Sequence, residues 1–142
     1  AIDKCRVGHT VADIHNEAVR VLVQGLIALQ LLTGTVDENI ESKAYRRFYM
    51  HGTGHWIGMD VHDVGPNERD GESRALEPGM VCTVEPGIYI SPDDDTVPEM
   101  YRGIGIRIED DIHITDGAPH NLTAMIPKSI EDVEALVGSA AS

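Results

Sequence analysis

Residues 104–114 read IGIRIEDDIHI, with an isoleucine at nearly every second position. Alternation with a period of two residues is typical of a β-strand that has one apolar face. Asp110 falls in the apolar phase, so we expect a bulge or a twist there. Arg107 and Glu109 share one face of this strand, and we expect the isoleucines to cover the other face against helices.

Two shorter apolar runs precede this strand. Met80–Val84 and Gly87–Ile90 are predicted strands, and Glu85-Pro86 separates them. Glu85 is therefore a carboxylate within an otherwise apolar segment. Burying an unpaired carboxylate costs several kcal/mol, so Glu85 needs a cation, a metal ion or hydrogen-bond donors as its partner.

Helices are expected at both ends of the chain. Apolar residues at i, i+3 and i+4 spacing predict a helix over residues 11–32, with Thr10 and Asp13 as a variant capping box at its start. A short helix is expected over Asp37–Ser42, and Ser129 is predicted to cap a last helix. The expected buried stripe of that last helix is Val133, Leu136 and Val137. This order of elements predicts one α+β domain.

Composition excludes several classes of partner. The 142 residues include 24 acidic and 11 basic side chains, for a formal net charge of −13. Such a surface repels phosphate, so binding to nucleic acid or to an anionic membrane is not expected. No apolar run approaches the ~20 residues of a membrane-spanning helix. With two cysteines and no signal-peptide pattern, we expect a cytoplasmic protein.

The segment His51–Asp63, HGTGHWIGMDVHD, contains three of the seven histidines. The spacing His51-x-x-x-His55 also occurs in helical zinc proteases, but their motif has a glutamate after the first histidine. Gly52 occupies that place, and together with Gly54 it disfavours a helix, so we reject a helical zinc site. The glycines instead predict a tight loop whose backbone passes close to a ligand or to another segment.

Imidazole and carboxylate groups together indicate a metal site. One imidazole with hard oxygen ligands suits Mn²⁺, Fe²⁺, Co²⁺ or Zn²⁺, and bridging carboxylates favour two ions about 3.5–4 Å apart that activate a shared water. The alternatives are an exposed position or a salt bridge for Glu85 and Glu109, and an ion pair between Arg107 and Glu109. We expect Cys82 and Trp56 in the core. The histidines expected at the surface are His9, His15, His113 and His120.

Four separated segments closely resemble the bacterial Xaa-Pro aminopeptidases (aminopeptidase P). This family belongs to the pita-bread metallopeptidases, together with prolidase, methionine aminopeptidase and creatinase. The segments follow the order that they have in the family: His51–Gly65, Leu76–Met80, Thr83–Tyr89 and Tyr101–Asp110. Several motifs in order are far more specific than any one of them.

The resemblance implies a two-manganese centre held by two aspartates, one histidine and two glutamates. His55 looks like the histidine ligand, and Glu85 and Glu109 look like the glutamate ligands. The two aspartates come, in the family, from a hairpin upstream of the matched segments. Residues 1–142 therefore resemble the C-terminal part of the metallopeptidase catalytic domain, the second half of a pita-bread fold. We expect a piece of a longer protein, with low or no activity alone and one metal ion or none.

The resemblance also implies roles around the substrate. His51 and His62 look like histidines that face the substrate and steady the tetrahedral intermediate. Arg107 looks like the arginine beside the metal centre, and Tyr89 like part of the wall of the proline pocket. The implied reaction removes the N-terminal residue from peptides with proline at the second position, with Glu85 relaying a proton to the leaving nitrogen.

Other functions stay open. A prolidase-like Xaa-Pro dipeptidase has similar motifs, although Pro98–Gly105 favours aminopeptidase P. Methionine aminopeptidase fits less well around residues 51–62. A non-catalytic pita-bread module for binding is the alternative from another class. Because half a domain exposes core surface and sheet edges, we expect the chain to form a homo-oligomer.

Overall fold

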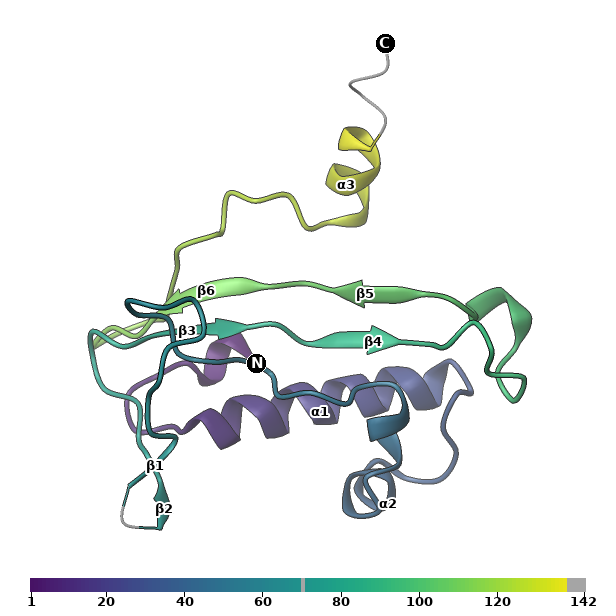
Figure 1. Cartoon of the computed structure of the whole chain (residues 1–142), viewed down its shortest axis with the longest axis horizontal. Helices are drawn as coiled ribbons and strands as arrows, with labels where there is room; N and C mark the ends of the chain where they lie inside the picture. The colour runs from purple at the N-terminus through teal and green to yellow at the C-terminus, as the bar shows by residue number, and fades with distance from the viewer. Residues whose placement is uncertain (70, 138–142) are drawn as a thin grey trace.

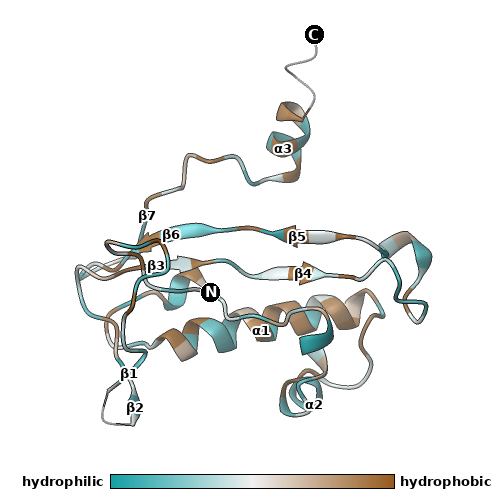
Figure 2. Ribbon diagram, in the orientation of Figure 1, coloured by the Kyte–Doolittle hydropathy of each residue, from teal (hydrophilic) through white to brown (hydrophobic). Residues whose placement is uncertain are grey.

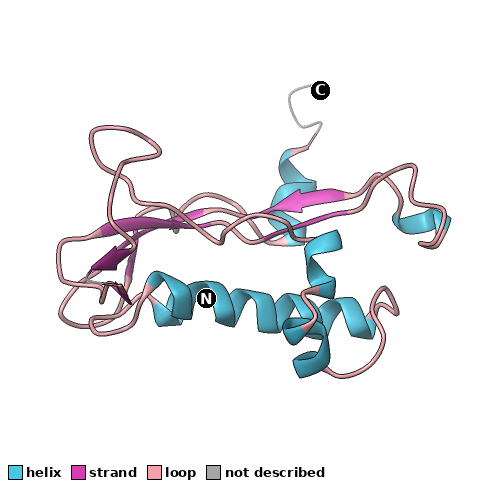
Figure 3. Cartoon of the chain, turned by 60° about the horizontal axis from the view of Figure 1, so that its bottom comes forward, coloured by secondary structure: helices cyan, strands magenta, loops and turns pink. Residues whose placement is uncertain are grey.

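A long antiparallel ribbon of strands lies over one long helix, as Figures 1 and 3 show from two directions. The computed structural model describes residues 1–69 and 71–137. The helices are α1 (Val11–Ala28), α2 (Val36–Glu41) and α3 (Ile130–Leu136), with 3₁₀ turns η1 (Ile2–Lys4), η2 (Ala44–Arg47) and η3 (Glu99–Tyr101). The strands are β1 (Glu68–Arg69), β2 (Glu72–Ser73), β3 (Val81–Val84), β4 (Gly87–Tyr89), β5 (Gly105–Arg107), β6 (Asp110–His113) and β7 (His120–Asn121).

The ribbon is interrupted at one point, where the break between β3 and β4 lies opposite the break between β5 and β6. β3 pairs with β6 and places Val84 opposite Asp110, while β4 pairs with β5 and places Gly87 opposite Arg107. The register is the same on both sides of the gap, so Glu85 faces Glu109. No residue is inserted, so the bulge expected at Asp110 is absent: Asp110 is paired with Val84, and the pairing is interrupted just before it, between β5 and β6.

Helix α1 begins as expected and ends earlier than expected. The Thr10 hydroxyl accepts the Asp13 backbone N–H, and the Asp13 carboxylate accepts the Thr10 backbone N–H, which confirms the capping box. The helix ends at Ala28 instead of at residue 32, because the chain turns at Gln30 with a φ of 59°. The short helix α2 starts at Val36, one residue before the predicted start.

The core is mainly aliphatic and lies between α1 and the ribbon. Cys82 and Trp56 are buried in it, as predicted. Its largest cluster contains Cys5, Ile14, Trp56, Leu76, Cys82, Val84, Ile112 and Ile114. The buried residues of α1 are Ile14, Ala18, Val19, Val23 and Leu26. Val21 and Leu29, which fit the helical spacing, are exposed.

Two predictions of burial are wrong. Ile112 and Ile114 are fully buried, but the other three isoleucines of the alternation lie on an open part of the ribbon. Their exposed fractions are 38% for Ile104, 58% for Ile106 and 45% for Ile108. Ser129 caps α3 as predicted, yet the predicted stripe on that helix is exposed. Figure 2 shows hydrophobic residues on α3, which stands apart from α1. Within the described residues, no helix is long and apolar enough to span a bilayer.

Candidate metal centre

The loop that carries His55 is aligned along the free edge of β3. Trp56 and Cys82 form an antiparallel bridge. Three backbone hydrogen bonds extend this pairing: Thr83 N to His55 O (2.9 Å), Ile57 N to Val81 O (3.1 Å) and Glu85 N to Thr53 O (2.6 Å). The loop therefore holds His55 beside the strand that leads to Glu85.

Gly54 allows this close approach. A Cβ atom at residue 54 would lie 2.0 Å from the Thr83 carbonyl oxygen, so only glycine fits without a shift of the backbone. The prediction of a close contact between the loop and another segment is confirmed at this position. At Gly52 a Cβ atom would meet nothing closer than 3.9 Å, so that glycine is not required by space.

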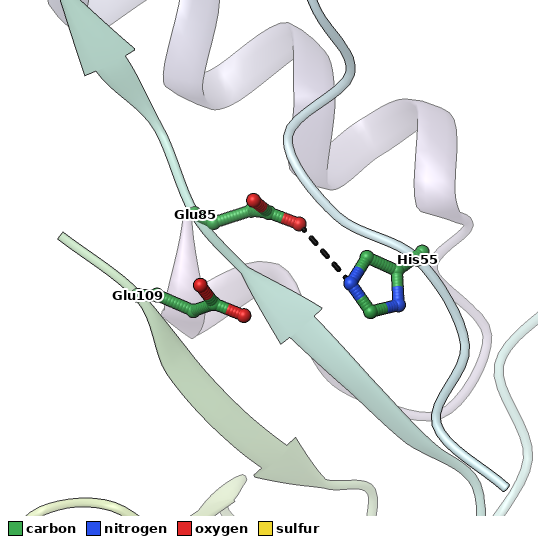
Figure 4. Close-up of side chains that lie close together, drawn as sticks. All are labelled: His55, Glu85 and Glu109. Carbon is green, nitrogen blue, oxygen red and sulfur yellow. Dashed lines mark ion pairs between the residues drawn. The ribbon is translucent and has the colours of Figure 1, made fainter. Parts of the chain in front are cut away.

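Three side chains from separate segments converge at the gap in the ribbon. His55, Glu85 and Glu109 each offer one ligand atom, and these atoms all lie within 4.8 Å of one another. Figure 4 shows the imidazole and both carboxylates pointing into the same space. Glu85 is 8% exposed and Glu109 is exposed. Facing carboxylates repel each other, and a cation between them removes that repulsion.

The ring of His55 is oriented with one nitrogen toward the ligand cluster. Its Nδ1 lies 2.9 Å from the backbone carbonyl oxygen of Trp56. Because a carbonyl only accepts, Nδ1 carries a proton, and Nε2 is the nitrogen that faces the carboxylates. Nε2 lies 3.4 Å from Oε1 of Glu85. The residues present therefore fit a divalent cation, with Nε2 of His55 and oxygens of both glutamates as its ligands.

The buried carboxylate of Glu85 has the partners that its sequence context demands. Its Oε1 accepts a hydrogen bond from Thr83 Oγ1 at 3.0 Å, and its Oε2 lies 3.3 Å from Arg107 Nη1. Arg107 therefore forms its ion pair with Glu85, across the ribbon, and the alternative pairing with Glu109 is wrong. The hydrogen bond with Tyr89 and the nearby carboxylates raise the pKa of Arg107, which keeps the guanidinium charged.

A directed chain of hydrogen bonds links Arg107 to His51. Arg107 Nε donates to the Tyr89 hydroxyl at 2.7 Å, and that hydroxyl lies 2.9 Å from His51 Nε2. His51 Nδ1 lies 2.6 Å from the carbonyl oxygen of Gly52, so Nδ1 carries the proton and Nε2 accepts from Tyr89. The exposed ring of His62 packs edge-on against His55, with centroids 4.3 Å apart.

His15 lies closer to the site than its sequence context predicted. We expected it at the surface, but it is half-buried and its Nδ1 lies 2.9 Å from the Thr53 hydroxyl. The signal was available, because His15 is four residues from both Val11 and Val19 and so lies on an apolar face of α1.

Residues 1–116 match the model of metallopeptidase family M24. The chain belongs to that family. Among relatives, the Xaa-Pro aminopeptidase of Escherichia coli K12 is 56% identical over 135 residues, which are 95% of this chain and 30% of the relative. The Xaa-Pro aminopeptidase of Haemophilus influenzae Rd is 53% identical over 137 residues, or 96% of this chain and 31% of the relative.

Solved structures agree with this assignment to M24. Aminopeptidase PepP from Pseudomonas aeruginosa superimposes with a TM-score of 0.94 and 51% identity, covering 99% of this chain and 32% of that one. The predicted α+β pita-bread fold is confirmed. The chain spans about 30% of the length of the relatives that it matches. Ligand and catalytic roles for the individual residues of this M24 chain stay predictions.

Proposed function

We propose that this chain is part of a metal-dependent aminopeptidase that removes an N-terminal residue preceding proline. The observation that carries the proposal is the convergence of His55, Glu85 and Glu109 in a chain whose relatives are named Xaa-Pro aminopeptidases. Those relatives are named aminopeptidases, which favours aminopeptidase P over a prolidase-like dipeptidase. A non-catalytic module would not require this ligand set together with the Arg107–Tyr89–His51 chain.

Manganese is the proposed metal. One imidazole and two carboxylates suit Mn²⁺, although zinc is also a candidate, because one solved structure is described as Zn-substituted E. coli aminopeptidase P in complex with product. A bound divalent ion supplies a water of lowered pKa and polarises the scissile carbonyl. We propose two ions in the full site, with two aspartates from an upstream segment, and one ion or none on this chain alone.

The proton chemistry is assigned to Glu85 and the two histidines. Glu85 takes a proton from the nucleophilic water and relays it to the leaving proline nitrogen, while Arg107 and Thr83 hold its carboxylate in place. His62 is exposed and packs beside His55, where it would contact a peptide bound at the ligand cluster. His51 accepts from Tyr89 at Nε2, so it donates to an oxyanion from that nitrogen only after Nε2 gains a proton.

The proposed substrates are peptides with proline at the second position. A solved structure is described as aminopeptidase P from E. coli with the inhibitor Pro-Leu, which is the product-like half of such a peptide. Tyr89 is proposed to line the proline site, because its hydroxyl bridges Arg107 and His51 next to the ligand cluster.

Two further proposals concern the state of the protein. The cytoplasm is proposed as its location, since both cysteines are free thiols buried in the core. Self-association into a homo-oligomer is proposed because the exposed isoleucines of the ribbon border an apolar groove of about 380 Å³ beside Leu22 and Leu29.

Calorimetric titration of the purified chain with MnCl₂ tests the ligand set. We expect weak binding of at most one ion, and loss of that binding in His55→Ala. His120→Ala, which changes an exposed histidine far from the cluster in sequence, serves as the matched control. Equal affinity in wild type and His55→Ala would contradict the assignment of the ligands.

A chimera tests the activity. This chain would replace the 135 matching residues of the E. coli Xaa-Pro aminopeptidase, and we expect manganese-dependent cleavage of Xaa-Pro tripeptides. Xaa-Ala tripeptides and Xaa-Pro dipeptides are the control substrates. Cleavage of the dipeptides alone would favour prolidase-like action, and a soluble, metal-loaded chimera that cleaves none of them would refute the proposal.

A further inference from the structure

A polar triad with two buried members lies outside the proposed ligand set. It consists of His15 on α1, Tyr49, and Thr53 in the loop before His55. Thr53 Oγ1 lies 2.9 Å from His15 Nδ1 and 2.6 Å from the Tyr49 hydroxyl oxygen. Thr53 is 3% exposed and Tyr49 is 1% exposed. Polar groups buried to this extent satisfy their hydrogen bonds within the protein.

The triad contacts the candidate metal centre at two points. The Tyr49 ring packs edge-on against His51, with centroids 4.9 Å apart and an interplanar angle of 78°. The Thr53 carbonyl oxygen accepts the backbone N–H of Glu85 at 2.6 Å. Thr53 therefore connects the ring that supports His51 with the strand that presents Glu85.

In one arrangement of protons, each hydroxyl group of the triad donates its proton to an acceptor within the triad. In it, the Tyr49 hydroxyl donates to Thr53 Oγ1, and the Thr53 hydroxyl donates to His15 Nδ1, so the His15 proton is on Nε2. In the reverse direction the Tyr49 hydroxyl proton has no acceptor among the described residues. An unpaired buried donor is costly, so the chain runs from Tyr49 through Thr53 to His15.

The surroundings favour this direction. Burial, followed by the charges of Arg46 and His51, lowers the pKa of His15, so its ring stays neutral and can accept. Burial raises the pKa of Tyr49, so its hydroxyl keeps the proton that it donates. All three residues line a cavity of about 520 Å³, but Tyr49 and Thr53 are buried and His15 is only half-buried, so a water partner is available to the second nitrogen of His15.

We propose that His15, Thr53 and Tyr49 are positioning residues, whose directed hydrogen bonds fix the ring of His51 and the backbone at Glu85. The triad itself touches neither substrate nor metal. It acts by limiting the positions that His51 can take when the peptide binds. This role rests on the proposed function for its catalytic consequence, but the hydrogen-bond direction is a property of the chain itself.

Nitrogen NMR of the histidine rings tests the direction without any activity. Long-range ¹H–¹⁵N spectra of the metal-free chain report which ring nitrogen carries the proton. We expect His15 to be protonated on Nε2 and His51 on Nδ1. A wild-type His15 protonated on Nδ1 would overturn the proposal.

Three variants test the connection to His51. Thr53→Val keeps the shape and the backbone carbonyl but loses the hydroxyl, and we expect it to shift the ring resonances of His51. Thr53→Ser should restore them. Thr35→Val is the matched control, since it removes a capping hydroxyl on α2 that does not contact the site. If the His51 resonances are the same in Thr53→Val as in the control Thr35→Val, the positioning role is wrong.

Tyr49→Phe provides an independent test in case Thr53→Val does not fold. Tyr49→Phe keeps the ring but removes the first donor, so the Thr53 hydroxyl still donates to His15. We expect His15 to stay protonated on Nε2 while the His51 resonances move. Unchanged His51 resonances in Tyr49→Phe would refute the link between the triad and the site.

Kinetics of the chimera extends the test to catalysis. We expect Thr53→Val to lower kcat about tenfold with KM within about twofold, and Thr53→Ser to recover the rate. Equal losses in Thr53→Val and Thr35→Val would reduce the role to stability and refute positioning. If the chimera cleaves no Xaa-Pro peptide, the proposed function fails, and the NMR experiments still decide the inference.

Discussion

Glu85 and Glu109 face each other across the ribbon, so the effect of removing one carboxylate depends on whether a cation is present. Glu109→Gln keeps the size of the side chain and removes its charge. Without metal the variant loses a repulsion, so we expect it to be more stable than the wild type. With metal it lacks one ligand, so we expect it to gain less stability from binding.

The size of both effects follows from the geometry. The ligand atoms lie within 4.8 Å, where two unit charges repel by about 1 kcal/mol in water and about 3.5 kcal/mol at an effective dielectric constant of ~20. Glu109 is exposed and Arg107 offsets part of the repulsion, so we expect the lower figure. Metal at 100 times its Kd stabilises the chain by about 2.7 kcal/mol, and a tenfold weaker Kd removes about half of that.

Urea unfolding with EDTA and then with saturating MnCl₂ measures both effects. The midpoint for Glu109→Gln should exceed the wild-type midpoint in EDTA, and the gain on adding manganese should be smaller. Glu99→Gln, on the exposed turn η3, controls for the general loss of an acidic charge. If Glu109→Gln is less stable than the wild type in EDTA, or gains as much from manganese, the two carboxylates do not share a cation.

Three other changes give separate tests. Gly54→Ala should lower the free energy of unfolding by about 2–3 kcal/mol and weaken manganese binding, because the added Cβ atom meets the backbone of Thr83. Gly52→Ala is the control and should change neither stability nor binding by much. Equal melting temperatures for the two variants would count against the close contact at Gly54. Lys128→Met breaks a 2.9 Å ion pair with Asp110 and should cost about 1–3 kcal/mol at pH 7. Burial raises the pKa of Asp110, but hydrogen bonds and the lysine charge outweigh it and lower the pKa overall. The stability that the ion pair contributes is therefore present above pH ~4 and is lost as the pH falls further. If Lys128→Met were still less stable than the wild type in urea unfolding at pH 2, this assignment would be contradicted. Ile106→Lys should reduce self-association in sedimentation velocity, and an unchanged distribution would exclude the ribbon face from the contact.

Local features of the fold were predictable because they depend on neighbours in the sequence. The capping box of Thr10 and Asp13 involves four consecutive residues, and Ser129 caps α3 in a similar way. The separation of β3 from β4 follows from Pro86, which has no backbone N–H to donate. None of these features requires knowledge of what packs against the element.

Burial was harder to predict, because it depends on what covers each face. Val21 fits the apolar spacing of α1 as well as Leu26 does, yet only Leu26 packs into the core. The isoleucine alternation correctly predicts strands, but it does not reveal that only Ile112 and Ile114 lie within the covered part of the ribbon. A period in the sequence identifies a face and leaves the partner of that face undetermined.

The candidate site required information from separate parts of the chain. The need of Glu85 for a partner came from its apolar surroundings, but its position opposite Glu109 depends on a strand register that the sequence does not state. The place of His55 came from the family resemblance. His15 was missed because histidine was judged by its polarity, although its place on an apolar face of α1 favours partial burial.

The gap in the ribbon explains how three segments meet at one point. Pro86 removes a donor from the ladder, while its carbonyl oxygen still accepts Ile108 N at 3.3 Å, so the strands stay in register across the interruption. The backbone N–H of Glu85 points, like that of Thr83, to the edge of β3 where the loop lies, and it donates to Thr53. One edge of this segment therefore pairs with the strand that carries Glu109, and the other edge pairs with the loop, which brings His55 to the place where the two glutamates face each other.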